Sequence, residues 1–387
     1  MVLAAALVAT LVGQTRLGAR APVGVLQVVM GVLVGPHVLG WIAPDPFLSR
    51  MVTVGTSALL FMAGMEIDFG LIRGRPLTLA LGGWIASAAV ALAAVGLLHI
   101  IPDVHAPLMI SIALTTTSLG VLLPALRDAG RLATLYGRLL LAAGSLGEVA
   151  PIVAAALVLS QRYTAWNEFG FLLLFLGLVG VAVAVGIGAR PPRVLAALQR
   201  TLRASTQIPV LLVLVIAAAF VALADEWGLE GILGAFAAGI IVGLSTRDKE
   251  AELFRDKLDA VMFGFLTPFF WVGTGIQFDV TALTRDVPTM LLVPTFLLLL
   301  LLVRGATVFL YLRDLSKAER LPFALSLPVA SLGIVVVITQ IGTRAQGMNP
   351  DVAQALIGAA VLSVLVYPTL AGIMLSRAVR SAPRDSA

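Results

Sequence analysis

Cysteine is absent from this chain of 387 residues, and charged residues and histidine are scarce. Without cysteine there is no disulfide bond, no thiolate metal site and no cysteine nucleophile. Charged residues make up 12% of the sequence, against roughly 25% in soluble domains, which excludes a water-soluble globule. His37, His99 and His105 stand far from a metal-ligand spacing, and no nucleotide-binding loop stands in a suitable context. We therefore expect no metal site and no cofactor.

Hydrophobic residues are abundant, at 59% of the chain, and the mean hydropathy is +1.03. Since a helix needs about 20 apolar residues to cross the hydrocarbon core, the sequence predicts an all-α polytopic protein of about 13 transmembrane helices. The net charge of +5 is then loop charge facing anionic lipid rather than a sign of nucleic acid. The predicted spans are 2–15, 22–42, 49–66, 77–99, 107–126, 133–160, 169–188, 207–224, 230–246, 259–277, 287–312, 321–342 and 352–376.

The distribution of Lys and Arg predicts how these spans face. Connections after odd-numbered spans, together with the C-terminal tail, hold 21 of the 26 basic residues, and the other connections hold 4. Because cytoplasmic connections collect Lys and Arg, we expect the N-terminus outside, and the C-terminus with a short tail at 381–387 in the cytoplasm. The plasma membrane, here a prokaryotic inner membrane, is the expected location.

Three short sequence matches predict an internal repeat. Gly31-Val-Leu-Val-Gly35 matches Gly239-Ile-Ile-Val-Gly243, Gly64-Met-Glu-Ile-Asp68 matches Gly275-Ile-Gln-Phe-Asp279, and Ser118-Leu-Gly-Val121 matches Ser331-Leu-Gly-Ile334. The matched spans are seven apart, an odd number, so the two six-helix halves cross the membrane in opposite senses. Inverted-topology repeats of this kind are typical of secondary transporters, whose site lies between discontinuous helices near the midplane.

Spans 5 and 12 carry residues that favour such an interruption. Hydroxyl groups can satisfy backbone groups where a helix unwinds, and unwound backbone at membrane depth is tolerated where it lines a cavity. An ordinary kinked helix is the alternative for either span alone, and the matched pair favours crossed, broken helices. The residues concerned are Thr115, Thr116, Thr117, Ser118, Gly120 and Pro124 in span 5, and Pro328, Ser331 and Gly333 in span 12.

Two charges lie in the middle of predicted spans, Glu148 in span 6 and Arg304 in span 11. Counting from the nearest cytoplasmic arginine, at 1.5 Å per residue both lie about 13–15 Å deep. Buried charges at this depth pair with one another or line a transport pathway. One interpretation is an ion pair that only ties two spans together. The other makes Glu148 the group that binds a cation or a proton, with Arg304 as its charge partner.

Small and hydroxyl residues around Glu148 complete the predicted site. We expect the hydroxyl groups of Thr116, Thr117 and Ser118 to be further ion ligands. Gly147 serves either helix packing or the room that a cation needs. Pro151 leaves a carbonyl three to four residues upstream without its helical donor, and this carbonyl is either a ligand for a hard cation or the mark of a packing kink.

Several segments resemble the cation:proton antiporter superfamily, in particular the Kef-type branch of the sodium/hydrogen exchangers. Gly31-Val-Leu-Val-Gly-Pro-His-Val-Leu-Gly40 is similar to that family's G-x-L-x-G-P-x-x-L-G segment, and Leu59-Leu-Phe-Met-Ala-Gly-Met-Glu-Ile-Asp68 is similar to its L-L-F-x-x-G-x-E-x-D segment. Gly234-Ala-Phe-Ala-Ala-Gly239 and Pro268-Phe-Phe-Trp-Val-Gly-Thr-Gly275 resemble two further stretches. The resemblance covers nearly the whole chain in order.

The resemblance implies one membrane domain over 1–380 with two moving parts. A dimerisation bundle is implied at about 1–72 and 205–283, a core transport bundle at about 76–160 and 287–379, and a linker helix at about 169–188. Family members carry Asp-Asp or Asn-Asp where this chain has Gly147-Glu148. Many relatives also carry Gly-Glu-Phe where this chain has Ser331-Leu-Gly333. The small residues Gly31, Gly35, Gly239 and Gly243 add to the implication of a homodimer.

The expected function is exchange of a monovalent cation, Na+ or K+, for protons by alternating access. One buried acid facing one permanent cation predicts electroneutral exchange, and no enzyme activity is expected. Two alternatives stay open from the sequence. A sodium-coupled symporter of organic anions shares the inverted-repeat architecture, and a transport-inactive membrane scaffold would use Glu148 and Arg304 only as a tie.

Overall fold

The computed structural model describes residues 1–15, 22–66, 74–98, 106–159, 177, 207–227, 231–246, 252–279, 281, 287–345 and 347–380. Every regular element in these residues is a helix. Seven of the helices are long and apolar enough to cross a membrane, and five apolar helices are shorter. The all-helical prediction is thus confirmed. Apart from residue 177, the predicted span at 169–188 lies outside the described residues, so the count of thirteen stays a prediction.

The chain forms two compact units, each assembled from segments that are distant in sequence. Unit 1 comprises Met1–Leu7, Leu33–Asp68 and Ala156–Gln277, and unit 2 comprises Val8–Val32, Phe69–Ala155 and Phe278–Ala387. Helix α1 (Val2–Gly13) contributes to both.

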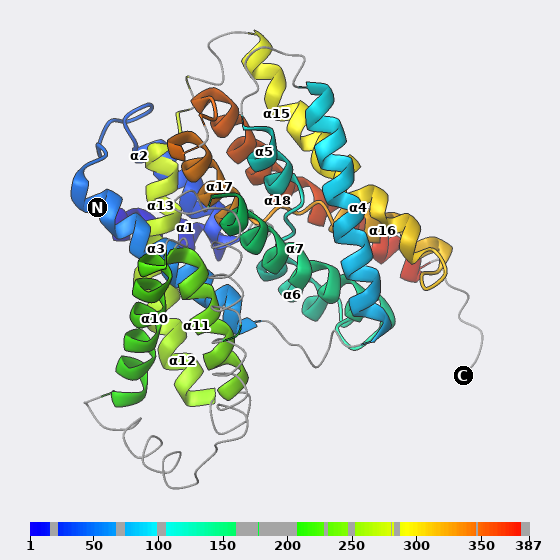
Figure 1. Ribbon diagram of the computed structural model, residues 1–387, viewed down its shortest axis with the longest axis horizontal. Helices are drawn as coiled ribbons and strands as arrows, with labels where there is room; N and C mark the ends of the chain where they lie inside the picture. Colours follow the sequence, from blue (N-terminus) through cyan, green and yellow to red (C-terminus); the bar gives the residue numbers. More distant parts are fainter. Residues whose placement is uncertain are drawn as a thin grey trace, which may run out of the picture. The chain divides into compact units, whose positions relative to one another are not determined.

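Unit 1 is built around α3, which packs against α11 and α13 (Figure 1). Its described helices are α3 (Pro46–Glu66), α10 (Ile208–Glu226), α11 (Gly231–Ser245), α12 (Glu252–Val261), the π-helix η3 (Met262–Leu266) and α13 (Thr267–Gln277). The last three run without a break, so the span predicted at 259–277 begins about two turns earlier, at Glu252.

Glycines let α3 and α11 approach until their backbones touch. A Cβ atom on Gly239 would overlap the carbonyl oxygen of Phe61, and one on Gly243 would lie 2.6 Å from the carbonyl oxygen of Met65. Gly64 on α3 meets the carbonyl of Phe236 in the same way. Small residues permit this close packing in membranes. Gly239 and Gly243, which the sequence suggested for a dimer face, are therefore occupied by packing inside one chain.

Unit 2 holds the remaining helices, and its long last helix, α18, lies against α15, α16 and α17 (Figure 1). Two of the predicted spans are interrupted, at Thr115–Ser118 and at 327–331. The helices are α2 (Val23–Val34), α4 (Arg75–Leu98), α5 (Pro107–Leu114), α6 (Leu119–Asp128), α7 (Leu135–Leu159), α15 (Val287–Leu300), the π-helix η4 (Leu301–Gly305), the 3-10 helix η5 (Ala306–Tyr311), α16 (Lys317–Ser326), α17 (Leu332–Ala345) and α18 (Pro350–Arg380).

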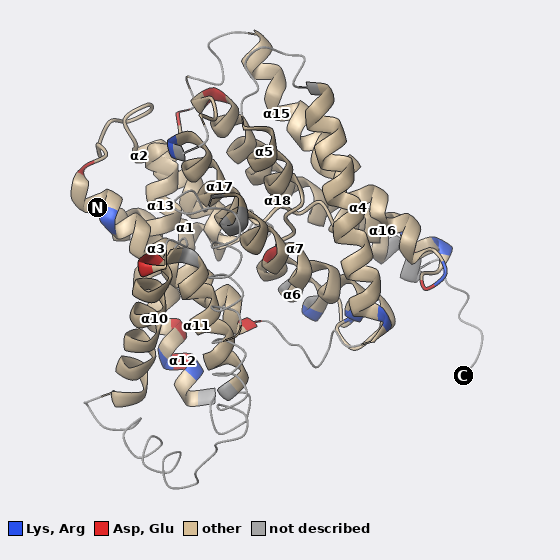
Figure 2. Ribbon diagram, in the orientation of Figure 1, with Lys and Arg blue, Asp and Glu red and all other residues tan. Residues whose placement is uncertain are grey.

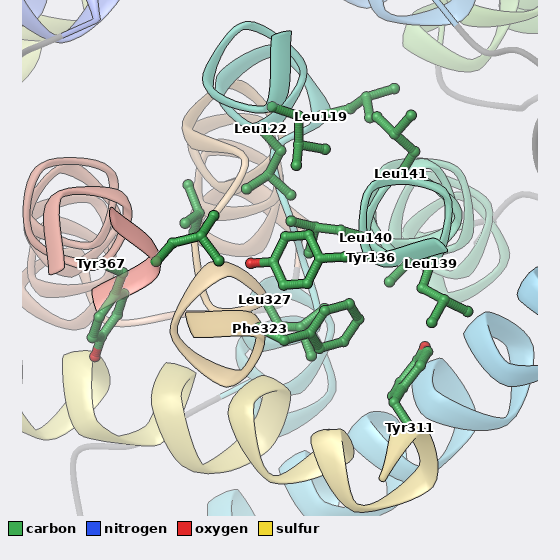
Figure 3. Packing of buried hydrophobic residues seen from close by; sticks show 14 of the residues in the cluster. Leu119, Leu122, Tyr136, Leu139, Leu140, Leu141, Tyr311, Phe323, Leu327 and Tyr367 are labelled. Atoms are coloured by element: carbon green, nitrogen blue, oxygen red, sulfur yellow. The ribbon is translucent and has the colours of Figure 1, made fainter. Parts of the chain in front are cut away.

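A buried apolar cluster joins α6, α7, η5 and α16 next to the interruptions (Figure 3). The rings of Tyr136 and Phe323 meet edge to face with 5.6 Å between their centroids, and the ring centroids of Tyr311 and Phe323 lie 4.8 Å apart. Leu119 and Leu327, one at each interruption, belong to the same cluster. Each fully buried side chain of this size contributes about 1.5–3 kcal/mol. The cluster therefore holds the two broken helices together from their apolar side.

Charged residues of unit 2 gather at the ends of α4, α6 and α16, and the lengths of these helices are mostly uncharged (Figure 2). Arg75 forms an ion pair of 2.7 Å with Asp314, and Arg131 forms one of 2.8 Å with Glu319. The hydrogen bonds from Arg75 hold the pKa of the Asp314 carboxyl below its usual value. This pattern fits helices whose ends alone reach water.

Candidate functional site

The first interruption, Thr115–Ser118, separates α5 from α6. The hydroxyl of Thr115 donates to the carbonyl of Ile112 at 2.7 Å, and the hydroxyl of Thr116 donates to the carbonyl of Ala113 at 2.8 Å. The backbone N–H groups of Thr115 and Thr116 donate to the same two carbonyls, at 3.0 and 3.3 Å, so the carbonyls at the end of α5 keep partners where the helix stops. The oxygen lone pairs of the two hydroxyls stay available as cation ligands.

The second interruption, at 327–331, lies against the first. The backbone N–H of Ser118 donates to the carbonyl of Val329 at 2.7 Å, and the hydroxyl of Thr117 donates to the carbonyl of Leu327 at 2.6 Å. From α18, the hydroxyl of Ser363 accepts the N–H of Ala330 at 3.0 Å. The two interruptions thus supply hydrogen-bond partners to each other, as buried polar backbone groups require.

Glu148 reaches the first interruption from α7. It is 4% exposed, and its Oε1 atom accepts the backbone N–H of Leu119, the first residue of α6, at 2.9 Å. A carboxylate at a helix N-terminus is stabilised by the free N–H groups and by the helix dipole. The predicted acid therefore lies directly beside the predicted break.

Gly147 and Pro151 make room for this contact. Pro151 cannot donate to the carbonyl of residue 147, and the N–H of Thr117 donates to that carbonyl instead, at 3.0 Å. A Cβ atom on Gly147 would lie 2.6 Å from the Cβ of Thr117 and 3.0 Å from Nη2 of Arg304. The carbonyl that Pro151 releases is thus bound by the broken helix, and Gly147 is required by that close approach.

Arg304 is 2% exposed, and its guanidinium is held by three different elements. Nε donates to the hydroxyl of Thr117 at 2.8 Å, Nη1 to the hydroxyl of Ser87 on α4 at 3.3 Å, and Nη2 to the carbonyl of Ala143 on α7 at 3.1 Å. All three acceptors are neutral oxygens. Arg304 and Glu148 therefore both bind the segment 117–119, and their direct charge pairing stays a prediction.

The other predicted site residues lie around this centre. Ser331 is 8% exposed and directly precedes α17, where Gly333 is the second residue. Gly120 and Pro124 lie within α6 rather than in the break. Sequence reasoning missed Ser87 and Ser363, both 0% exposed. A single serine in an otherwise apolar stretch is the signal that could have pointed to each of them.

Together these groups form a site that suits a hard cation or a proton. It offers one carboxylate, several hydroxyl oxygens and backbone carbonyls, and hard cations prefer oxygen ligands. Among the described residues, no group of three or more acidic or histidine side chains could hold a resident metal ion.

The comparison with protein families gives a match to the description "Sodium/hydrogen exchanger, transmembrane" over residues 2–377. The chain belongs to this exchanger family. It is a multi-pass membrane protein of a family of transporters.

Individual relatives have low sequence identity to this chain, but the matches cover most of its length. The chain is 24% identical over 392 residues to a Na+/H+ antiporter of Enterococcus hirae, covering 94% of each chain. It is 27% identical over 336 residues to the high-affinity Na+/H+ antiporter NhaS3 of Synechocystis, covering 84% of this chain and 71% of the relative. It is also 26% identical to YjbQ of Bacillus subtilis over 90% of its own length, and it spans 58% of that longer protein.

The fold resembles that of a solved antiporter structure. The structure of the sodium proton antiporter MjNhaP1 from Methanocaldococcus jannaschii matches with a TM-score of 0.65 at 17% sequence identity. The match covers 98% of this chain and 97% of the other. At this identity the likeness establishes the shared fold.

Proposed function

We propose that the protein exchanges a monovalent cation, Na+ or K+, for protons across the membrane. The observation that carries this proposal is the buried carboxylate of Glu148 at the contact of two broken helices, in a chain of the exchanger family. Relatives named as Na+/H+ antiporters support the substrate class. No observation favours an organic-anion symporter or an inactive scaffold.

In this mechanism Glu148 binds either the proton or the cation, and never both at once. The oxygens of Thr116, Thr117 and Ser118 complete the cation's shell, and Arg304 supplies a fixed positive charge nearby. Because one acid alternates between one proton and one monovalent cation, each cycle moves no net charge. Gly147 stands where the family resemblance implies Asp, Asn or a similar residue, and it has no side-chain ligand, so Glu148 acts alone.

The architecture that we propose around this site is an inverted repeat. The interruptions in the fifth and twelfth predicted spans support it, because they fall at the matched Ser118 and Ser331 positions. Alternating access then requires the core transport bundle, at about 76–160 and 287–379, which holds the site, to move relative to the dimerisation bundle at about 1–72 and 205–283. A homodimer in a prokaryotic inner membrane is the proposed setting.

Proton movement in proteoliposomes tests the function. The purified chain is reconstituted with a pH-sensitive dye inside, and Na+, K+ or Li+ is added outside. We expect at least one of these cations to trigger a proton flux. When Na+ or Li+ drives the flux, its rate should be the same whether or not valinomycin and K+ clamp the membrane potential. Sodium uptake that depends on an organic anion, or no flux of any kind, would refute cation/proton exchange.

A further inference from the structure

The span that carries Arg304 contains two irregular helical stretches in direct succession. Regular helix α15 leads into the π-helix η4, which has 5 residues, and η4 leads into the 3-10 helix η5, which has 6 residues. A π turn bonds residue i to i+5 and so takes up about one residue more than an α turn. Six residues at 3.0 per turn make about two turns, for which an α-helix needs about seven residues.

The two irregularities therefore cancel. The π turn takes up about one extra residue and the 3-10 stretch recovers about one, so the ends of the span keep the register of a continuous α-helix. Between them the register is displaced by nearly one residue, which is about 100° of rotation. Arg304 lies in this displaced part. In a continuous α-helix Val303 would point close to where Arg304 now points, and Arg304 would turn away from Thr117.

Local packing fits the displaced register. Leu302 and Phe309, on the outer side, are 54% and 72% exposed. The hydroxyl of Thr307 in η5 donates to the carbonyl of Arg304 in η4 at 2.6 Å, which ties the start of the 3-10 stretch to the π-helix. A Cβ atom on Gly305 would lie 3.0 Å from the carbonyl oxygen of Ala324, so glycine at this position lets α16 lie close.

We propose that η4 and η5 together shift the helical register locally, and that this shift, the register device, positions Arg304 in the site. The guanidinium reaches Thr117, Ser87 and Ala143 because the π turn precedes it, and the 3-10 stretch confines the displacement to this part of the span. The inference refines the proposed cation/proton exchange and rests on it only where transport is the readout.

Two single-residue deletions distinguish a role of the shifted register from ordinary packing of this span. Deleting Leu302 removes the extra residue of the π turn, so Arg304 keeps its direction and η5 keeps the far end in place. Deleting Phe309 removes a residue after Arg304, and the span can keep both ends in register only by giving up the π turn. Arg304 then turns away, and Val303 takes its direction. Both deletions remove one exposed apolar side chain from the same span.

We expect the Leu302 deletion to retain exchange and the Phe309 deletion to lose it. Adding Val303→Arg and Arg304→Val to the Phe309 deletion should restore exchange, because the arginine again points at Thr117. The same double substitution in the full-length chain should lose exchange. Failure of this rescue, or equal exchange by the two deletions, would overturn the proposal.

Thermal unfolding in detergent provides a readout that does not need transport. Arg304→Ala should lower the unfolding temperature of the Leu302 deletion as much as that of the wild type, and should change that of the Phe309 deletion little. If neither deletion folds, the span cannot absorb a missing residue and the proposal fails. If the wild type shows no exchange but this temperature pattern appears, the proposed function fails and the register device stands.

Discussion

Two buried side chains of opposite charge, Glu148 and Arg304, both form hydrogen bonds with the short segment 117–119. Glu148 binds the N–H of Leu119, and Arg304 binds the hydroxyl of Thr117. Such charges are costly to bury unless they are hydrogen-bonded, and here the partners are groups that the broken helix itself exposes. The break and the two side chains therefore stabilise each other. In the exchange that we propose, binding of the cation or the proton to Glu148 would act directly on the first turn of α6.

Glu148→Gln tests the assigned ion-binding group. The amide keeps the shape and can still accept from Leu119, but it neither carries a charge nor exchanges a proton. We expect a folded protein without cation-driven proton flux in proteoliposomes. Asp351→Asn, which changes an acid in the first turn of α18, is the control and should exchange normally. Flux that persists in Glu148→Gln would reject the site.

Gly147→Ala tests the close approach of α7 to the first interruption. The added methyl group would meet Thr117 at 2.6 Å, and overpacking of this kind costs about 1–3 kcal/mol. The unfolding temperature in detergent should fall, and exchange should fall with it. Gly82→Ala on α4, where a Cβ meets nothing within 4 Å, should be neutral or slightly stabilising. Equal behaviour of the two variants would show that Gly147 is not constrained.

Thr117 is the residue that connects Arg304 to the second interruption, because its hydroxyl accepts from Arg304 and donates to Leu327. Thr117→Val removes both bonds and leaves a buried donor of Arg304 without its acceptor, which costs about 1–3 kcal/mol. Thr117→Ser keeps the hydroxyl. Unfolding temperatures in detergent should drop clearly for valine and little for serine, and the reverse order would contradict this role.

At the scale of the elements, the sequence predicted the two interrupted spans and the structure explains their positions. Clustered hydroxyls mark the first break, and Pro328 and Ser331 mark the second, because unwound backbone needs local hydrogen-bond partners and proline lacks a helical donor. The π and 3-10 stretches of η4 and η5 could not be predicted, since Leu301–Tyr311 reads as an ordinary membrane helix around the single charge of Arg304, and its register depends on where that side chain finds acceptors. Ser363 was missed because its role, capping Ala330, depends on contact between distant segments.

Ser363→Ala tests how the second interruption is held. The substitution leaves the buried N–H of Ala330 without the acceptor that it has at 3.0 Å, so the unfolding temperature should fall by the equivalent of about 1–3 kcal/mol. Ser363→Thr retains an acceptor oxygen and is the matched control. If alanine is as stable as the wild type, another acceptor replaces Ser363 and the assignment is wrong.

At the scale of the whole molecule, the distribution of Lys and Arg and the proposed inverted repeat predict how the chain is oriented in the membrane. The inverted repeat predicts the connection between α11 and α12, which contains Arg247 and Lys249, in the cytoplasm, and the connection between α10 and α11 outside. An accessibility tag in the first connection and one after Ala387 should therefore both be cytoplasmic, whereas a tag near Trp227 should be external. The basic residues favour this arrangement because Lys and Arg are retained on the cytoplasmic side. A chain that begins outside and crosses the membrane an odd number of times must end in the cytoplasm. An external C-terminus would therefore contradict the span count and the inversion together.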